Sequence, residues 1–263
     1  MSQRPSFSFD EVFDAAEYLH FYDDTLRAED TPRQVDFLER EMPIAPGARV
    51  LDLGCGHGRH ANELSRRGHH VMGVDLVMGF LELARAEARA EGLAVDYALG
   101  DARGLGVRGA FDNVVCLFDA FGFLDDEGNQ AHLHAAAAAL VSGGSLLLDV
   151  RNRDWIARSI LPVTVLDKGE DMMIDRHAFD SATGRLVDRR TYVRGGAART
   201  VTFSLRLYSL SELTMMLRAV GLTVERSWGG WNGGPVSLAQ NRLMVLARKG
   251  AALSEEPHPA RKA

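Results

Sequence analysis

Short runs of apolar and β-branched residues alternate along the chain with longer segments of helical periodicity. The strand-like runs are ARVLDL (48–53), HHVMGVDL (69–76), AVDYALG (94–100), FDNVVCLF (111–118) and SLLLDV (145–150). Helical patterns lie between them, in RHANELSRRG, FLELARAEARAEG and NQAHLHAAAAAL. Nearly continuous apolar strands separated by helices are typical of a parallel sheet that is covered on both faces. The pattern therefore predicts an α/β domain.

The pattern changes after residue 150. Between 171 and 208, three segments read as antiparallel strands joined by the turn sequences DSATG and RGGAA. A helix is predicted at SLSELTMMLRAVG, where Ser209 and Glu212 have the spacing of a capping box and Gly221 ends the pattern. Two strands follow, LTVERSW and NRLMVLAR, and we expect the second to join the main sheet as an antiparallel strand. The α/β domain is thus interrupted by a β-insertion.

These changes of pattern divide the chain into four parts. We expect an N-terminal helical segment, an α/β domain in two pieces, an antiparallel β-insertion and a polar, disordered tail. The helical segment covers 1–34 and the α/β domain covers 35–158 and 209–249. The β-insertion covers 159–208 and the tail 250–263.

Composition narrows the classes of function. The net charge of −6, with 36 acidic against 30 basic residues, argues against a nucleic-acid-binding protein. The basic stretch DRRTYVRGGAAR (188–199) is read as the solvated face of an antiparallel strand. The sequence has no apolar run long enough to span a membrane and no signal-peptide pattern at its start. Two cysteines, Cys55 and Cys116, make no disulfide framework, so we expect a reducing, cytoplasmic location.

A glycine loop follows the first strand, in LDLGCGHGRH (51–60). Gly54 and Gly56 permit a tight turn and a close approach of backbone N–H groups to a ligand. Asp75 ends the second strand, where an acid can reach ribose hydroxyls. A nucleoside cofactor is therefore expected. The third glycine, Gly58, comes one position too early for a dinucleotide fingerprint, and Asp52 suits a cationic ligand better than a pyrophosphate.

The segments LDLGCGHGRH, GVDL, GDAR and LVSGGSLLLDV closely resemble successive motifs of class I S-adenosylmethionine (SAM)-dependent methyltransferases. The resemblance covers roughly residues 35 to 150 and the final helix with its two strands. It implies a seven-stranded, mostly parallel sheet with helices on both faces and an antiparallel last strand, which agrees with the strand count. It also implies SAM as methyl donor and S-adenosylhomocysteine (SAH) as product.

Carried over position by position, the resemblance assigns a set of cofactor-binding residues. The glycines would line the methionine moiety, the acid after the second strand would bind the ribose, and the acid in GDAR would meet the adenine. The N-terminal segment would fold over the same edge as a lid and reach the carboxylate end. The full set is Tyr22, Asp52, Gly54, Gly56, Asp75, Leu76, Asp101, Ala102 and Leu117.

Aromatic segments indicate where a substrate would lie. Two of them, CLFDAFGF (116–123) and SWGGWNGG (227–234), follow strands of the main sheet, and ligands bind beyond the carboxyl ends of such strands. AEYLHFYDD (16–24) belongs to the lid. We therefore expect Tyr18, Phe118, Phe121 and Trp231 in the substrate pocket. No residue is identified as catalytic, because methyl transfer mainly requires that the acceptor be aligned with the methyl group.

Several alternatives remain open. A metal-assisted O-methyltransferase would use Asp119 with Asp149 and Asn152, although two residues separate the latter pair. The stretch from Asp149 to Arg153 instead resembles the D-x-x-N-R of a metal-independent subgroup with a β-insertion after strand five. Some members of that subgroup methylate amines of sugars or of amino-acid-derived metabolites.

We therefore favour a small-molecule acceptor with an amine nitrogen over a hydroxyl oxygen, and no bound metal. An NAD-dependent oxidoreductase and a non-catalytic scaffold are further alternatives. An exposed edge of the insertion also suggests a homodimer.

Overall fold

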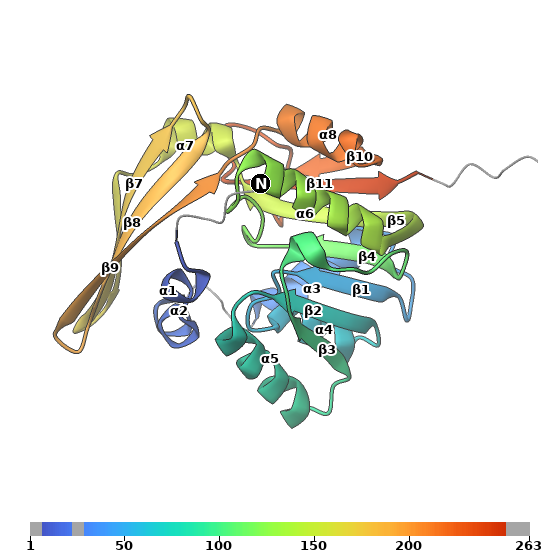
Figure 1. The fold of residues 1–263 in the computed structure, drawn as a ribbon, viewed down its shortest axis with the longest axis horizontal. Helices are drawn as coiled ribbons and strands as arrows, with labels where there is room; N and C mark the ends of the chain where they lie inside the picture. The colour runs from blue at the N-terminus through green and yellow to red at the C-terminus, as the bar shows by residue number, and fades with distance from the viewer. Residues whose placement is uncertain (1–6, 23–28, 251–263) are drawn as a thin grey trace, which may run out of the picture.

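A seven-stranded sheet forms the centre of the computed structural model, which describes residues 7–22 and 29–250 (Figure 1). Its strand order is β10-β11-β5-β4-β1-β2-β3, and β11 runs antiparallel to both of its neighbours. The predicted fold class is confirmed. The strands are β1 (Arg49–Leu53), β2 (His70–Asp75), β3 (Val95–Leu99), β4 (Phe111–Cys116), β5 (Leu140–Arg151), β10 (Leu222–Trp228) and β11 (Arg242–Lys249).

Helices cover both faces of this sheet. Buried apolar side chains of α3 (Asp30–Glu41) and α4 (Arg59–Arg66) pack on one face, and those of α6 (Asp126–Ala139) and α8 (Leu210–Ala219) pack on the other. A further helix of the main domain, α5 (Met78–Ala90), contacts α4 and β3. A short 3-10 turn, η1 (Ala102–Gly104), follows β3 and contacts α6. The predicted capping box at Ser209 and Glu212 is present at the start of α8.

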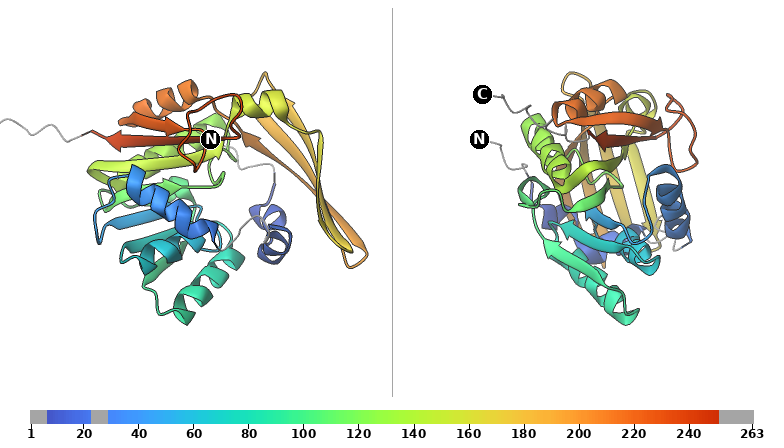
Figure 2. Two further views of the ribbon diagram at one scale, coloured as in Figure 1. Left: turned by 180° about the vertical axis from the view of Figure 1, so that it is seen from behind. Right: turned by 90° about the vertical axis from the view of Figure 1, so that its right-hand side faces the viewer.

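A second, antiparallel sheet forms the insertion, with strand order β6-β7-β8-β9. Its strands are β6 (Val163–Lys168), β7 (Asp171–Asp180), β8 (Arg185–Arg194) and β9 (Ala197–Arg206). The sequence patterns predicted neither β6 nor the preceding helix α7 (Arg153–Ser159). Two short N-terminal helices, α1 (Phe9–Val12) and α2 (Ala15–Tyr22), lie between this sheet and the main domain (Figures 1 and 2). They contact β9 and β6 respectively.

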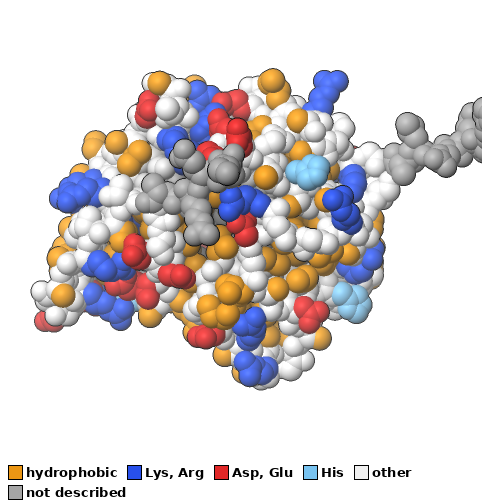
Figure 3. Space-filling model, viewed as in Figure 1, with side chains coloured by type: hydrophobic (Ala, Val, Ile, Leu, Met, Phe, Trp, Pro, Cys, Tyr) orange, Lys and Arg blue, Asp and Glu red, His pale blue; other side chains and the backbone are white. Residues whose placement is uncertain are grey.

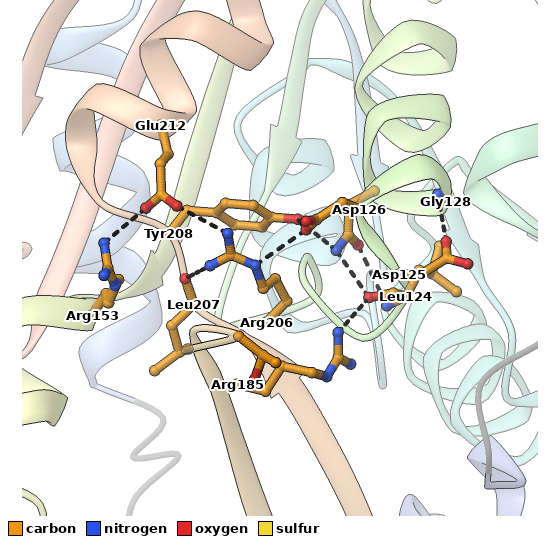
Figure 4. Close-up of polar contacts among 12 residues, drawn as sticks. Leu124, Asp125, Asp126, Gly128, Arg153, Arg185, Arg206, Leu207, Tyr208 and Glu212 are labelled. Carbon is orange, nitrogen blue, oxygen red and sulfur yellow. Dashed lines mark hydrogen bonds and ion pairs between the residues drawn. The ribbon is translucent and has the colours of Figure 1, made fainter. Parts of the chain in front are cut away.

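A polar cluster anchors the end of β9 to the helices of the main domain (Figure 4). The guanidinium of Arg206 donates to Oδ1 of Asp126 at 3.1 Å and to Oε1 of Glu212 at 2.9 Å. The hydroxyl of Tyr208 donates to the same Asp126 oxygen at 2.8 Å, and Arg185 of β8 reaches the carbonyl of Leu124. The insertion is therefore tied to the first turn of α6 and of α8.

On the face drawn in Figure 3, side chains of both charges are interspersed over the insertion at the left. No helix among the described residues is long and apolar enough to cross a membrane. Both cysteines are buried and unpaired. The tail predicted to be disordered lies, from residue 251 onward, outside the described residues.

Candidate active site

A cavity of about 320 Å³ opens at the carboxyl ends of the central strands. Its wall combines the loops after β1, β2, β3 and β4 with α1, α2 and the inner side of β8 and β9. The cavity thus lies where the resemblance places the cofactor. Of the predicted site residues, those that line it are Tyr18, Tyr22, Asp52, Gly54, Gly56, Asp75, Leu76, Asp101, Ala102, Leu117 and Phe118.

Two predicted pocket residues, Phe121 and Trp231, are not among the residues that line the cavity. Phe121 is 2% exposed and packs against His132 of α6. Trp231 stacks on His60 and on Phe118. Phe121 therefore belongs to the core, and Trp231 supports the cavity wall from behind.

The glycine loop after β1 turns sharply beneath the cavity. Gly54, Gly56 and Gly58 all have positive φ, at 71°, 54° and 80°. A Cβ on Gly54 would lie 2.4 Å from the Cβ of Ala120, whereas a Cβ on Gly56 would meet nothing within 4 Å. Gly54 therefore allows the loop to approach the turn after β4, and Gly56 leaves open space above the loop for a ligand.

Asp75 holds this loop in place. The N–H of Gly56 donates to its Oδ2 at 2.8 Å, and the N–H of Val77 donates to its Oδ1 at 2.9 Å. Burial raises the pKa of Asp75. Because each oxygen of a carboxylate accepts more than one hydrogen bond, the same group can still accept from ribose hydroxyls.

Asp52, at the end of β1, is 2% exposed. Burial, with a smaller contribution from Asp75, raises its pKa to about 7. Its Oδ2 has no hydrogen-bond partner among the described residues. A buried carboxylate without a partner is stabilised by a nearby positive charge, so this end of the cavity fits a cationic group such as a sulfonium.

Asp101 also lines the cavity, at the start of η1. Its carboxylate accepts from Nε of Arg103 at 2.9 Å and from the Arg103 backbone N–H at 2.9 Å. The ion pair with Arg103 lowers the pKa of Asp101. A ligand N–H at this position would share the carboxylate with Arg103.

Arg59, the first residue of α4, lines the cavity beside the glycine loop. Its guanidinium donates to the neutral groups of Thr31 and Gln34, at 2.9 and 2.6 Å. It lies over the ring of Phe118, 4.2 Å from the centroid. It forms no ion pair within the described parts of the chain, and burial lowers its pKa to about 10. A buried guanidinium that has no ion-pair partner and lies at a helix N-terminus attracts an anion.

Tyr18 and Tyr22 of α2 close the cavity on the lid side, with ring centroids 4.7 Å apart. The hydroxyl of Tyr22 accepts a hydrogen bond from Arg190 at 2.8 Å. Burial raises the pKa of Tyr18 to about 12, so its hydroxyl stays protonated at neutral pH.

The turn after β4 contains two consecutive non-glycine residues with positive φ, Phe118 at 52° and Asp119 at 64°. Such strained residues persist only where surrounding contacts hold them. Here the N–H of Phe118 donates to Oδ2 of Asp149, and Oδ2 of Asp119 accepts from Arg151 at 3.0 Å and from Arg242 at 3.1 Å. Burial alone would raise the pKa of Asp119, but the two arginines lower it. The carboxylate therefore stays charged within the wall.

The insertion supplies wall residues that the sequence reading missed, from the strand that was read as a solvated face. In β8, Asp188 and Arg190 are only 2% and 4% exposed and line the cavity. Arg190 is paired with Asp175, its Nε donating to Oδ1 at 2.7 Å. The solvated-face reading is therefore wrong for the inward positions, because alternate residues of β8 face the main domain.

The geometry also bears on the metal-assisted alternative. Arg242 donates to Oδ1 of Asp149 at 2.7 Å and to Oδ2 of Asp119, so a guanidinium already compensates both carboxylates. The side chain of Asn152 caps α7 and donates to the carbonyls of Ser237 and Gln240. These three side chains are engaged in structural contacts, and no cluster of potential metal ligands occurs among the described residues.

The matches to known protein sequences lie in the α/β domain. Residues 50–144 match the family described as "Methyltransferase domain". A curated relative, the ubiquinone biosynthesis O-methyltransferase of Xanthomonas euvesicatoria, is 32% identical over 124 residues. That alignment covers 46% of this chain and 50% of the relative. The chain thus spans about half the length of the curated relatives that it matches.

Solved structures extend the likeness to the insertion. A SAM-dependent methyltransferase from Clostridium acetobutylicum superposes with a TM-score of 0.78 at 21% identity, covering 90% of this chain and 99% of its own. SAM-bound amino pentose methyltransferase from Micromonospora echinaspora superposes with a TM-score of 0.59 at 24% identity, covering 94% and 100%. These two show the same fold. Residues 50–144 therefore belong to the methyltransferase-domain family, and the chain as a whole has the fold of these SAM-dependent methyltransferases, with an antiparallel β-insertion.

Proposed function

We propose that this protein transfers a methyl group from SAM to an amine nitrogen of a small molecule. The observation that carries the proposal is the convergence of the glycine loop, Asp75 and Asp101 on one cavity, which also contains residues of the lid and the insertion. SAM supplies an electrophilic methyl group when it is bound. The chain's own residues bind the cofactor, exclude water and orient the acceptor.

The cofactor end of the cavity fits SAM in three respects. Asp75 offers carboxylate oxygens to the ribose, and Asp52, whose pKa is raised to about 7 by burial, offers a carboxyl group whose charged form a sulfonium would stabilise. Arg59 offers a buried guanidinium without a carboxylate partner, and we assign it to the carboxylate of the methionine moiety.

The preference for an amine rests on the acceptors near the turn after β4. Asp119 stays charged, and its Oδ1 has no partner within the described parts of the chain. Carboxylate oxygens accept hydrogen bonds from N–H groups, so Asp119 would orient an amine whose unprotonated form is the nucleophile. A sugar N-methyltransferase from Streptoalloteichus with the same fold (TM-score 0.64) is in line with an amine, whereas the curated relative is an O-methyltransferase. A hydroxyl acceptor, with or without a metal ion, is the second candidate.

The cofactor assignment is tested by calorimetric titration with SAH. We expect Asp75→Ala to weaken binding roughly 10- to 100-fold, because a hydrogen bond to a charged group contributes about 1.5–3 kcal/mol. Asp96→Ala, on the exposed side of β3, is the control and should leave binding unchanged. Failure of the wild-type protein to bind SAH would refute the proposal.

The role of Arg59 is tested with two ligands. Arg59→Met should weaken SAH binding by a similar factor of roughly 10 to 100. It should leave binding of 5′-methylthioadenosine unchanged, because that nucleoside lacks the amino-acid carboxylate. An equal loss for both ligands would show that Arg59 maintains the loop and does not contact the carboxylate.

The acceptor atom is tested by incubating the protein with SAM labelled on its methyl group and a fractionated metabolite extract. Mass spectrometry of the labelled product then distinguishes an N-methyl from an O-methyl group by its fragments. Repeating the reaction with a chelator tests the metal-assisted alternative, since a metal-dependent reaction would stop.

We also propose a homodimer that forms through the insertion. In the described residues β6 is an unpaired edge of its sheet, and Val163 and Val165 on it are 47% and 52% exposed. Exposed apolar edge strands favour pairing with a second chain. Light scattering of the wild type and of Val165→Lys tests this, and a monomeric wild type would exclude it. The cytoplasmic location stays a prediction from cysteine usage.

A further inference from the structure

Four phenylalanines from three separate segments surround the insertion side of the cavity: Phe9 of α1 with Phe13 directly after that helix, Phe123 after β4, and Phe203 of β9. The ring of Phe123 meets Phe13 edge to face at 5.3 Å between centroids and meets Phe9 at 5.7 Å. Phe203 lies 6.3 Å from Phe13. We call these four residues the phenylalanine cluster.

The cluster differs from the phenylalanines of the core. Phe21, Phe37 and Phe121 are at most 2% exposed, whereas Phe9, Phe13 and Phe123 are only half-buried although each contacts other rings. All four residues of the cluster line the cavity; the three half-buried rings present apolar surface there, and Phe203, 6% exposed, packs behind them. Exposed apolar surface within a cavity favours an apolar ligand.

The cations next to the cluster already have partners. Arg190 lies 5.2 Å from the centroid of Phe203, but its charge is compensated by Asp175. Arg151 is paired with Asp119 and lies 4.0 Å from Asp188. Among the described residues, the insertion side therefore offers no uncompensated positive charge for a phosphate or carboxylate on the acceptor. The phenyl rings of the cluster themselves offer no hydrogen-bonding groups to a sugar, and the polar groups of Asp188 and Arg190 beside them are already engaged in ion pairs.

We infer that the acceptor carries an aromatic ring, which docks against the phenylalanine cluster while its amine faces the cofactor side of the cavity. This inference rests on the proposed function and names its substrate class as aromatic amines. Aromatic rings prefer edge-to-face and offset contacts of the kind that these side chains already make with one another. The cluster then selects for the ring.

The test is calorimetric titration of SAH-saturated protein with 2-phenylethylamine and with glucosamine. We expect the aromatic amine to bind and the amino sugar to bind at least tenfold more weakly. Phe123→Leu should weaken the aromatic amine about three- to tenfold, because the ring contact is lost while the site stays apolar. The matched control is Phe179→Leu. Phe179 packs against the same small core cluster as Phe123 but does not line the cavity, so binding should be unchanged.

The outcomes separate this inference from the proposed function. If the protein binds SAH but binds glucosamine more tightly than 2-phenylethylamine, or does not bind 2-phenylethylamine at all, the aromatic class is overturned. The proposed methyltransferase function would still stand. Equal losses for Phe123→Leu and Phe179→Leu would also overturn it, because the effect would then be one of packing. Absence of SAH binding by the wild type would refute the proposed function itself.

Discussion

Arg242 joins the last strand of the sheet to the strained turn of the cavity wall, and replacing it with methionine tests how that turn is held. Its guanidinium donates to Oδ1 of Asp149 at 2.7 Å, to the Asp149 carbonyl at 3.1 Å and to Oδ2 of Asp119 at 3.1 Å. Methionine resembles the aliphatic part of the arginine side chain but carries no charge. The substitution would leave two buried carboxylates with less compensation, of which Asp149 is 0% exposed.

Removing one partner of a buried ion pair typically costs about 3–5 kcal/mol, and we expect Arg242→Met to lower the free energy of unfolding by that amount. Urea denaturation in the absence of ligand measures it, as a shift of the midpoint at constant slope. Arg248→Met on the same strand is the matched control. Arg248 pairs with Glu225 at the surface, where an ion pair contributes at most about 1 kcal/mol. A loss for Arg242→Met that is no larger than that of the control would refute the reasoning.

Three further predictions follow from single contacts. Gly54→Ala should destabilise the protein and weaken SAH binding, as measured by thermal shift and calorimetry, because the new methyl group would lie 2.4 Å from Ala120 Cβ at a φ of +71°. In the folded protein the pKa of Asp52 is about 7, above its ordinary value, so its ionisation opposes folding. The free energy of unfolding of the ligand-free protein should therefore fall as pH rises from about 4 to 7. Urea denaturation across that range should show a smaller fall for Asp52→Asn. Ser209→Ala should lower the free energy of unfolding by about 1 kcal/mol, because the capping box with Glu212 is lost.

The cofactor end of the site could be predicted from the sequence because its residues follow their strands directly. Gly54, Gly56 and Asp75 are held in register by β1 and β2, which pair in parallel. The positions of these residues in the sequence are therefore enough to predict their positions in the site. No comparable pattern identifies Asp188 or Arg190, since both faces of β8 carry polar residues and only packing against the main domain decides which face is buried.

The position of Phe121 shows a second limit of prediction from the sequence. The two positive-φ residues after β4 interrupt the extended chain, so Phe118 and Phe121 turn to different faces of the sheet. Phe118 stacks with His60 of α4, and Phe121 meets His132 of α6. A strained turn in non-glycine residues has no signature in the sequence. The direction of side chains beyond it could therefore not be predicted.

The position of the insertion affects how the sheet can fold. Arg151 at the end of β5 pairs with Arg242 at the start of β11. This pairing closes a loop of roughly 90 residues, and the entropic cost of closing the loop falls if the intervening chain folds first. Within the insertion, neighbouring strands pair as successive antiparallel hairpins, which need only short loop closures. Once β9 has formed, the N–H of Arg206 bonds to the carbonyl of Gly122, beside the cavity. The insertion thus shortens the effective loop, and an early-folding β-meander would speed completion of the central sheet.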